Sequence, residues 1–193
     1  MATGEQKYFI AIVPPEPLYE EITALKEKIA VDYHTKGAMR SPPHITLHMP
    51  FEWNEAKEEK LMAKLRDFSF MSEVLTISLN GFNSFPPRVV FIDVVDNQPL
   101  RDLQLQLFRH CKTNLNLFNA NYRDKPFHPH ITLAFRDLKK DMFHALWNNI
   151  KSERFEHTFH AREYHLLKHD GTKWNSYHQF PLKSNAKSGT TFG

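Results

Sequence analysis

The chain has 193 residues, of which 41% are hydrophobic and 24% are charged, and its formal net charge is +3. These values are typical of a globular domain and exclude a chain that is disordered throughout. Cys111 is the only cysteine, so an internal disulfide and a zinc ribbon are excluded. No apolar run reaches the roughly 18 residues that a membrane span needs, and the N-terminus does not resemble a signal peptide. We therefore expect a cytoplasmic protein without a membrane partner.

The first half of the sequence alternates between strand and helix patterns. In chain order we expect a strand at residues 8–13, a helix opened by Pro17, a strand-like stretch at residues 42–51, a helix at residues 54–68 and a strand at residues 74–82. We expect Gly81 to mark the end of the last of these strands.

The second half repeats this order. We expect a strand at residues 89–95, a helix opened by Pro99, a strand-like stretch at residues 128–137, a helix around residues 142–150, and closing strands at residues 160–167 and 177–182 joined by a turn at residues 169–174. A repeated order predicts one unit used twice. The sequence thus predicts a single domain at residues 1–183 with lobes at residues 7–86 and 87–183, followed by a flexible tail at residues 184–193.

One tripeptide occurs at matching places in both halves. His-Ile-Thr lies within "PPHITLHMPF" (residues 42–51) and within "HPHITLAFRD" (residues 128–137). Side chains alternate along a strand, so His44 shares a face with Thr46, and His130 shares a face with Thr132. The isoleucine and leucine of each copy lie on the opposite, core-facing side. If a two-fold axis relates the lobes, two imidazoles and two hydroxyls converge on one cleft.

This set of groups suits a phosphodiester. A neutral histidine can take a proton from the attacking hydroxyl, and a protonated histidine can give one to the leaving oxygen. The threonine hydroxyls can donate hydrogen bonds to the phosphate oxygens. Such chemistry requires no metal.

These residues resemble the two-histidine (2H) phosphoesterase superfamily, and in particular its bacterial 2′-5′ RNA ligase-like branch. The resemblance rests on "YFIAIVPP", "PPHITLHMPF", "PPRVVFIDV" and "HPHITLAFRD". It implies an α+β fold that is bilobal, with antiparallel sheets facing a central groove and helices outside. It also implies action on 2′,3′-cyclic phosphates or 2′-5′ phosphodiesters of RNA or nucleotides, with His130 as base and His44 as acid.

Further residues are candidates for substrate binding, each with a plainer alternative. His48 and Arg136 lie on the polar face if their strands continue, but each also fits a surface role. Phe9, Phe51 and Phe91 are aromatic side chains suited to stacking on a base or to the core. Arg40 precedes the first motif and suits a phosphate or a solvated loop.

His128 and His130 form a His-Pro-His sequence that raises the question of a zinc site. No third or fourth ligand stands at a metal-binding spacing, so we expect no metal and no cofactor. The leading hypothesis is a cyclic phosphodiesterase or 2′-5′ RNA ligase-like enzyme that is a monomer. Cleavage of 2′-5′ oligoadenylates or of ADP-ribose cyclic phosphate is a second enzymatic hypothesis. A nucleotide- or RNA-binding protein of the same fold with little turnover is the alternative from another class.

Overall fold

The structure is a computed structural model that describes residues 4–118 and 126–183; the predicted tail at residues 184–193 lies outside them. Its strands are β1 (Glu5–Ile12), β2 (Ile45–Asn54), β3 (Leu75–Phe85), β4 (Val89–Val94), β5 (His130–Ala134), β6 (Glu156–Ala161), β7 (Glu163–His169) and β8 (Trp174–Pro181). Its helices are α1 (Leu18–Asp32), α2 (Glu58–Arg66), α3 (Gln98–Leu115) and α4 (Lys140–Ile150), with short 3-10 helices η1 (Gly37–Arg40) and η2 (Glu55–Lys57).

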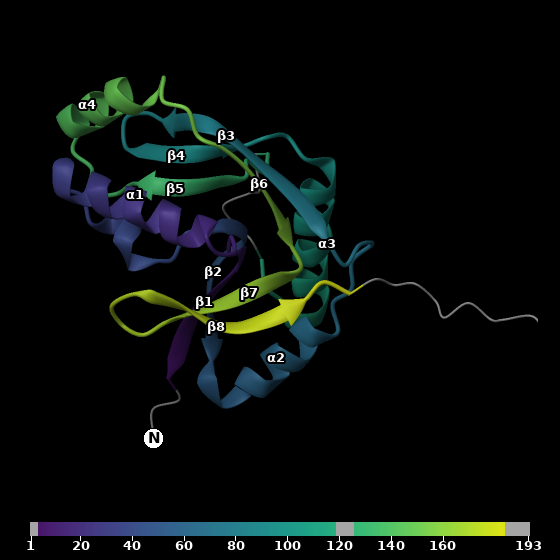
Figure 1. Ribbon diagram of the computed structural model, residues 1–193. Helices are drawn as coiled ribbons and strands as arrows, with labels where there is room; N and C mark the ends of the chain where they lie inside the picture. The colour runs from purple at the N-terminus through teal and green to yellow at the C-terminus, as the bar shows by residue number, and fades with distance from the viewer. Residues whose placement is uncertain (1–3, 119–125, 184–193) are drawn as a thin grey trace, which may run out of the picture.

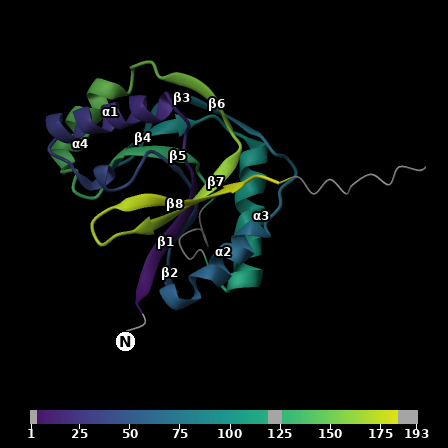
Figure 2. The same cartoon turned by 60° about the horizontal axis from the view of Figure 1, so that its bottom comes forward.

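The strands form one curled sheet in the order β6-β3-β4-β5-β2-β1-β7-β8, and all neighbouring pairs are antiparallel. α1 and α4 lie beside β3, β4 and β5, whereas α2 and α3 lie on the other half of the sheet (Figure 1). In the turned view, α1 and α4 lie on one side of the molecule, and α2 and α3 lie on the other (Figure 2). The predicted α+β fold with antiparallel strands and outer helices is confirmed, and the two expected sheets are joined where β2 meets β5.

The strand order is symmetric about that junction. β2 and β5 occupy the centre, each flanked by the apolar strand that opens its half of the sequence, β1 and β4 respectively. Each side of the sheet also takes strands from the other half: β3 pairs with β4, and β7 pairs with β1. This exchange of strands brings the two copies of the motif to the middle of the sheet.

α3 begins and ends at an asparagine cap. In α3 the Asn97 side chain accepts a hydrogen bond from the Leu100 amide at 3.0 Å, which caps the first turn. Asn116 ends the helix in the left-handed conformation with φ 55°, a common way to close a helix. No helix within residues 4–118 and 126–183 has the length and apolarity that crossing a membrane would require.

β1 is apolar on both faces because both faces are covered. Tyr8 and Ile10 belong to the main core, whereas Phe9 and Ala11 pack with Leu167 on the opposite face. This second cluster forms the floor under one of the two motif histidines, as described below. The continuous apolar run that predicted a buried strand is therefore explained by two layers of packing.

Two predicted boundaries are wrong. Gly81 does not end β3, because with φ +68° it produces an irregularity in the pairing with β4, and the strand continues to Phe85. Such a bulge needs a left-handed residue, which glycine adopts without strain. Residues 160–167 are not one strand, because Arg162 separates β6, which pairs with β3, from β7, which pairs with β1. An apolar pattern alone does not reveal that a chain changes partners at one residue.

Candidate active site

The two copies of the motif meet at the centre of the sheet. Ile45 of β2 pairs with Ile131 of β5. In an antiparallel register this pairing sets His44 across from Thr132 and Thr46 across from His130. These four residues line one cavity of about 360 Å³. The predicted alternation also holds, because Ile45 and Ile131 are fully buried while the histidines and threonines are partly exposed.

Both imidazoles are held in the same way by the backbone. His44 Nδ1 lies 2.7 Å from the Pro42 carbonyl oxygen, and His130 Nδ1 lies 2.8 Å from the His128 carbonyl oxygen. A carbonyl oxygen only accepts hydrogen bonds, so Nδ1 carries the proton in each ring. Nε2 is then the nitrogen that gains or loses a proton, and it is the one left for a ligand.

Phe9 and Phe91 support the two rings with nearly identical geometry. The Phe9 and His44 ring centroids are 4.8 Å apart at 51°, and those of Phe91 and His130 are also 4.8 Å apart at 51°. Both phenylalanines are buried, at 3% and 0% exposure. Their positions suit fixing the imidazoles rather than stacking freely on a base, although Phe9 also contributes to the cavity wall.

The structure does not bring His48 and Phe51 to this cavity. The register of β2 against β1 shifts twice between Tyr8 and Ala11, so Leu47 and His48 are both buried. His48 Nδ1 lies 2.9 Å from the Met49 carbonyl oxygen, and its ring packs against Phe51 at 5.4 Å. A strand without these bulges would have placed His48 on the face of His44, as we expected.

Arg40 and Arg136 both line the cavity. Arg40 is the last residue of η1, and Arg136 lies in the loop after β5. Neither guanidinium forms an ion pair with a carboxylate of the described residues. Arg136 has φ 63°, a left-handed conformation that is unfavourable for a residue with a side chain. Arg136 stacks on the Phe135 ring at 5.1 Å, and two arginines that form no ion pair with the described residues make the cavity attractive to an anion.

Asp137, next to Arg136, bonds to the segment that leads to Arg40. Its carboxylate accepts hydrogen bonds from Thr35 Oγ1 at 2.7 Å, from the Lys36 amide at 2.7 Å and from the Gly37 amide at 3.0 Å. Burial opposes ionisation, but these bonds outweigh it and hold the pKa of Asp137 below its usual value. A Cβ on Gly37 would lie 2.6 Å from the Phe135 carbonyl oxygen, so this close approach requires glycine.

The two histidines differ in the charges around them. Burial lowers the pKa of His44 to about 4; the Pro42 carbonyl opposes this change, and the charges of Lys26 and His130 reinforce it. Burial also lowers the pKa of His130; the His128 carbonyl oxygen opposes this change, the charge of His128 reinforces it, and the negative charge of Asp93 opposes it. The site is therefore symmetric in geometry but not in electrostatics.

Sequence reasoning missed several residues of the cavity wall. Trp174 and His169, from the hairpin of β7 and β8, line it and pack edge-on at 4.8 Å, and Trp174 also packs on Phe9 at 4.8 Å. The sequence pattern assigned residues 169–174 only a turn. One feature of the sequence could have indicated this role: Trp174 is an aromatic residue directly after a turn, where a strand starts.

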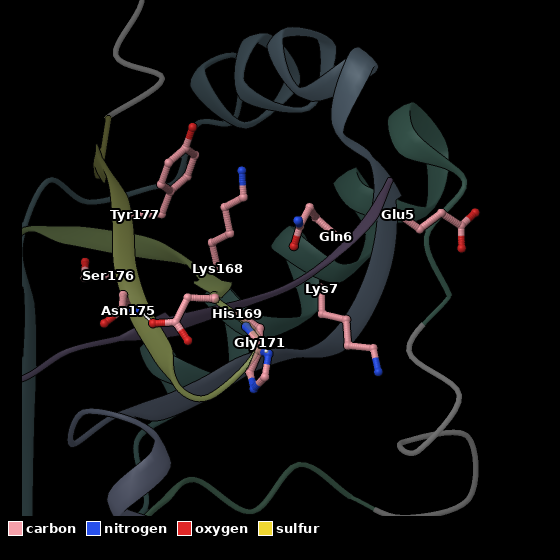
Figure 3. Close-up of a pocket in the computed structure, with 10 residues that line it drawn as sticks. Glu5, Gln6, Lys7, Lys168, His169, Gly171, Asn175, Ser176 and Tyr177 are labelled. Carbon is pink, nitrogen blue, oxygen red and sulfur yellow. Dashed lines mark hydrogen bonds between the residues drawn. The ribbon is translucent and has the colours of Figure 1, made fainter. Parts of the chain in front are cut away.

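A larger cavity of about 620 Å³ lies nearby along β1 and the hairpin of β7 and β8 (Figure 3). Its Lys168 and Tyr177 point the same way in the close-up, and both bond to Glu58. Lys168 also contacts Glu55 at 2.9 Å, so its charge is already neutralised. This cavity contains neither motif histidine. Over residues 4–118 and 126–183, no cluster of three or more histidine, cysteine, aspartate or glutamate residues is arranged to hold a metal ion.

Comparisons with known proteins agree on one family. The model of the 2′-5′ RNA ligase superfamily matches residues 14–173. A relative from Oceanobacillus iheyensis named "Putative phosphoesterase" is 30% identical over 179 residues, covering 91% of this chain and 98% of the relative. Among solved structures, TT0787 of Thermus thermophilus has a TM-score of 0.66 and 22% identity, and Escherichia coli LigT complexed with 3′-AMP has a TM-score of 0.64 and 20% identity. Both alignments cover 93% of this chain and 99% of the other.

Proposed function

The chain belongs to the 2′-5′ RNA ligase superfamily of phosphoesterases, and from this premise we propose that it opens 2′,3′-cyclic phosphates at the ends of RNA or on nucleotides. The same site would serve a related ring opening, in which a 5′-hydroxyl attacks phosphorus in place of water, the 3′ oxygen leaves, and a 2′-5′ phosphodiester forms. The observation that carries the proposal is the pair of backbone-anchored imidazoles, His44 and His130, on the wall of one cavity with Thr46 and Thr132.

The reaction needs one base and one acid. One imidazole, which is neutral, takes a proton from water as the water oxygen bonds to phosphorus. The other imidazole, which is protonated, gives its proton to the ribose oxygen as the bond between that oxygen and phosphorus breaks. The product is a nucleotide with a 2′- or 3′-phosphate. Nε2 of each ring is the atom that moves the proton, since Nδ1 is held by a carbonyl oxygen.

The surrounding charges favour one assignment of these roles. The base must be neutral, and His44 has its pKa lowered to about 4 by burial, with Lys26 adding to the effect. The acid must keep a proton; burial lowers the pKa of His130 and the charge of His128 adds to this change, whereas the His128 carbonyl oxygen and the negative charge of Asp93 oppose it. We therefore propose His44 as base and His130 as acid, the reverse of the roles that the resemblance implies.

The hydroxyls of Thr46 and Thr132 would donate hydrogen bonds to the non-bridging phosphate oxygens, where negative charge gathers in the transition state. Arg40 and Arg136 would pair with the phosphate or with the rest of the substrate. These donors stabilise the charge without a metal ion.

Nucleotides suit the site on chemical grounds, and the fold neighbour LigT has been solved with 3′-AMP, NADP+ and ATP. We propose that the protein acts as a cytoplasmic monomer.

The proposal is tested with a panel of 2′,3′-cyclic mononucleotides, cyclic-ended RNA and 2′-5′-linked oligonucleotides, with and without a chelator. The position of the phosphate in the product identifies which P–O bond breaks. Chelator-resistant ring opening of at least one cyclic phosphate supports the proposal. Tight nucleotide binding without turnover of any member of the panel would instead support the alternative, a nucleotide- or RNA-binding protein.

A further inference from the structure

A smaller cavity, of about 230 Å³ and distinct from the one in Figure 3, adjoins the active-site cavity. Ser41 and Trp174 line both, so the two cavities share a wall. Pro42 and Pro43, which lead into His44, lie in the wall of the second cavity. We refer to it as the Lys26 cavity, after the charged side chain that distinguishes it.

Lys26 is a buried cation with no carboxylate partner among the described residues. Its exposed fraction is 3%, and its ammonium donates one hydrogen bond, to the Ser41 carbonyl oxygen at 2.6 Å. No carboxylate of the described residues lies within 4.0 Å of it. Burial lowers its pKa to about 8, so it still carries its charge at neutral pH. A buried charge of this kind is costly unless a ligand neutralises it.

The remaining wall is also suited to an anion. Lys173 lies in it and forms no ion pair with the described residues. The nearby carboxylate of Asp170 accepts hydrogen bonds from the amides of Thr172 and Lys173 and from Asn175 Nδ2, and it also interacts electrostatically with Lys173. The contrast with Lys168 is direct, since that lysine is neutralised by two glutamates. Two lysines therefore line one small cavity, and none of its described lining residues is acidic.

We propose that the Lys26 cavity binds a second phosphate group of the substrate, through Lys26 and Lys173, while the cyclic phosphate lies between His44 and His130. This inference rests on the proposed function and narrows it to substrates with two phosphate groups. Those are either a mononucleotide with a 5′-phosphate or an oligonucleotide whose preceding phosphodiester reaches the cavity. In both, an anion bound by two ammonium groups gains charge-assisted hydrogen bonds.

The test compares a 2′,3′-cyclic nucleoside monophosphate with and without an added 5′-phosphate, and with a cyclic-ended dinucleotide, at pH 7. We expect the wild-type protein to prefer a substrate with two phosphates by about tenfold or more in kcat/KM. Lys173→Met and Lys26→Met should each reduce this ratio toward one. A preference for the 5′-phosphate alone identifies a mononucleotide substrate, and a preference for the dinucleotide alone identifies RNA.

Lys28→Met is the matched control, because Lys28 lies on the same helix but is exposed and paired with Asp32 at 2.5 Å. It should leave the ratio unchanged. Lys173→Met keeps the test valid if Lys26→Met fails to fold. A wild-type ratio near one, or a ratio that both cavity variants leave intact, overturns the inference while the proposed function stands.

If no cyclic substrate is turned over, the proposed function fails and binding decides the inference separately. Calorimetry would then compare a nucleoside 3′-monophosphate with a nucleoside 3′,5′-bisphosphate. Tighter binding of the bisphosphate that is lost in Lys173→Met supports the second phosphate site. Equal binding of the two ligands contradicts it.

Discussion

Ile45 of β2 pairs with Ile131 of β5, so the middle residues of the two His-Ile-Thr copies lie opposite each other. This one register relationship explains why both histidines reach one cavity although they lie in different halves of the chain. A slip of one residue in either strand would turn its histidine toward the core. The proposed active site therefore depends on the register of the central pair as much as on the identity of the four side chains.

The threonine hydroxyls should matter less than the imidazoles. Thr46→Val and Thr132→Val each remove one donor to the phosphate oxygens and leave proton transfer possible. We expect kcat/KM for a 2′,3′-cyclic nucleotide to fall by about 10- to 100-fold in each variant. Thr→Ser variants, which keep the hydroxyl, are the controls and should retain most of the activity. A loss in the serine variants as large as in the valine variants would mean that the methyl group, not the hydroxyl, is needed.

Inorganic phosphate should bind in the active-site cavity without a metal ion. Titration followed by calorimetry should give the same dissociation constant with and without a chelator. Arg136→Ala should weaken binding, since it removes an unpaired cation from the cavity wall. Arg154→Ala is a control outside the cavity, because that exposed arginine pairs with Glu156 at 3.0 Å. Binding abolished by the chelator would contradict metal-free recognition.

The pH dependence should report the charge difference between the two histidines. If His44 is the base, kcat/KM rises as the pH passes upward through about 4, where His44 loses its proton. If His130 is the acid, kcat/KM falls again as His130 loses its proton, at a pH below its ordinary value because its pKa is lowered. Asp93→Asn removes a negative charge and should move the falling limb to lower pH.

The residual activity of single variants identifies the roles. His44→Ala should lose the rising limb, and His130→Ala should lose the falling limb. Lys26→Met removes a positive charge near His44 and should move the rising limb to higher pH. If His44→Ala instead loses the falling limb, the roles are those implied by the family resemblance.

The link made by Asp137 should stabilise the protein and support substrate binding. Asp137→Ala leaves the Thr35 hydroxyl and the Lys36 and Gly37 amides without their acceptor. We expect the free energy of unfolding to fall by about 1 kcal/mol, because two of the three bonds are exposed to solvent, and KM to rise because the segments that carry the two arginines are no longer held together. Denaturant unfolding and steady-state kinetics measure the two effects. Asp67→Ala, at an exposed ion pair with Lys64, is the control and should change neither quantity appreciably.

Acid should destabilise the fold through its buried histidines. His165 is 6% exposed, and burial lowers its pKa to about 4. Between its ordinary value and pH 4 the unfolded chain binds the proton more readily, so stability falls as the pH falls through this window. The shift corresponds to an upper limit of about 3 kcal/mol.

Unfolding midpoints measured from pH 7 to pH 4 test this prediction. His165→Gln cannot gain the proton and should show a flatter decline than wild type. The exposed His144→Gln should follow the wild-type curve. A decline of equal slope in all three proteins would mean that His165 contributes nothing to acid sensitivity.

The sequence predicts what depends on local spacing. The alternation of His44, Ile45 and Thr46 predicts which side chains face the cavity and which face the core, and it holds although β2 begins only at Ile45. The prediction for His48 is wrong, because the register shifts in β2 depend on pairing with β1 and leave no sign in the residues themselves. The exchange of β3 and β7 between the two sides of the sheet is likewise set by packing of the whole chain.

The position of Lys26 in the sequence pattern does not by itself predict a ligand site. It follows Ile22 by one helical turn and lies on the buried stripe of α1 with Ile22 and Ile29. A lysine at such a position is either buried or breaks the stripe, and the sequence does not say which. Its neighbours Ser41 and Lys173 come from distant segments, so only the folded chain shows that the cation adjoins the active site.

Turnover of a 2′,3′-cyclic mononucleotide by His44→Ala, His130→Ala and the double variant tests the central claim most directly. We predict that each single variant loses about 10²–10⁴-fold in kcat, because each removes one proton-transfer group. The double variant should be little worse than the worse single variant, since both groups act on one transition state. Circular dichroism would confirm that the variants are folded. Single variants that are folded and turn over at near wild-type rates would contradict paired acid–base catalysis by the two motifs.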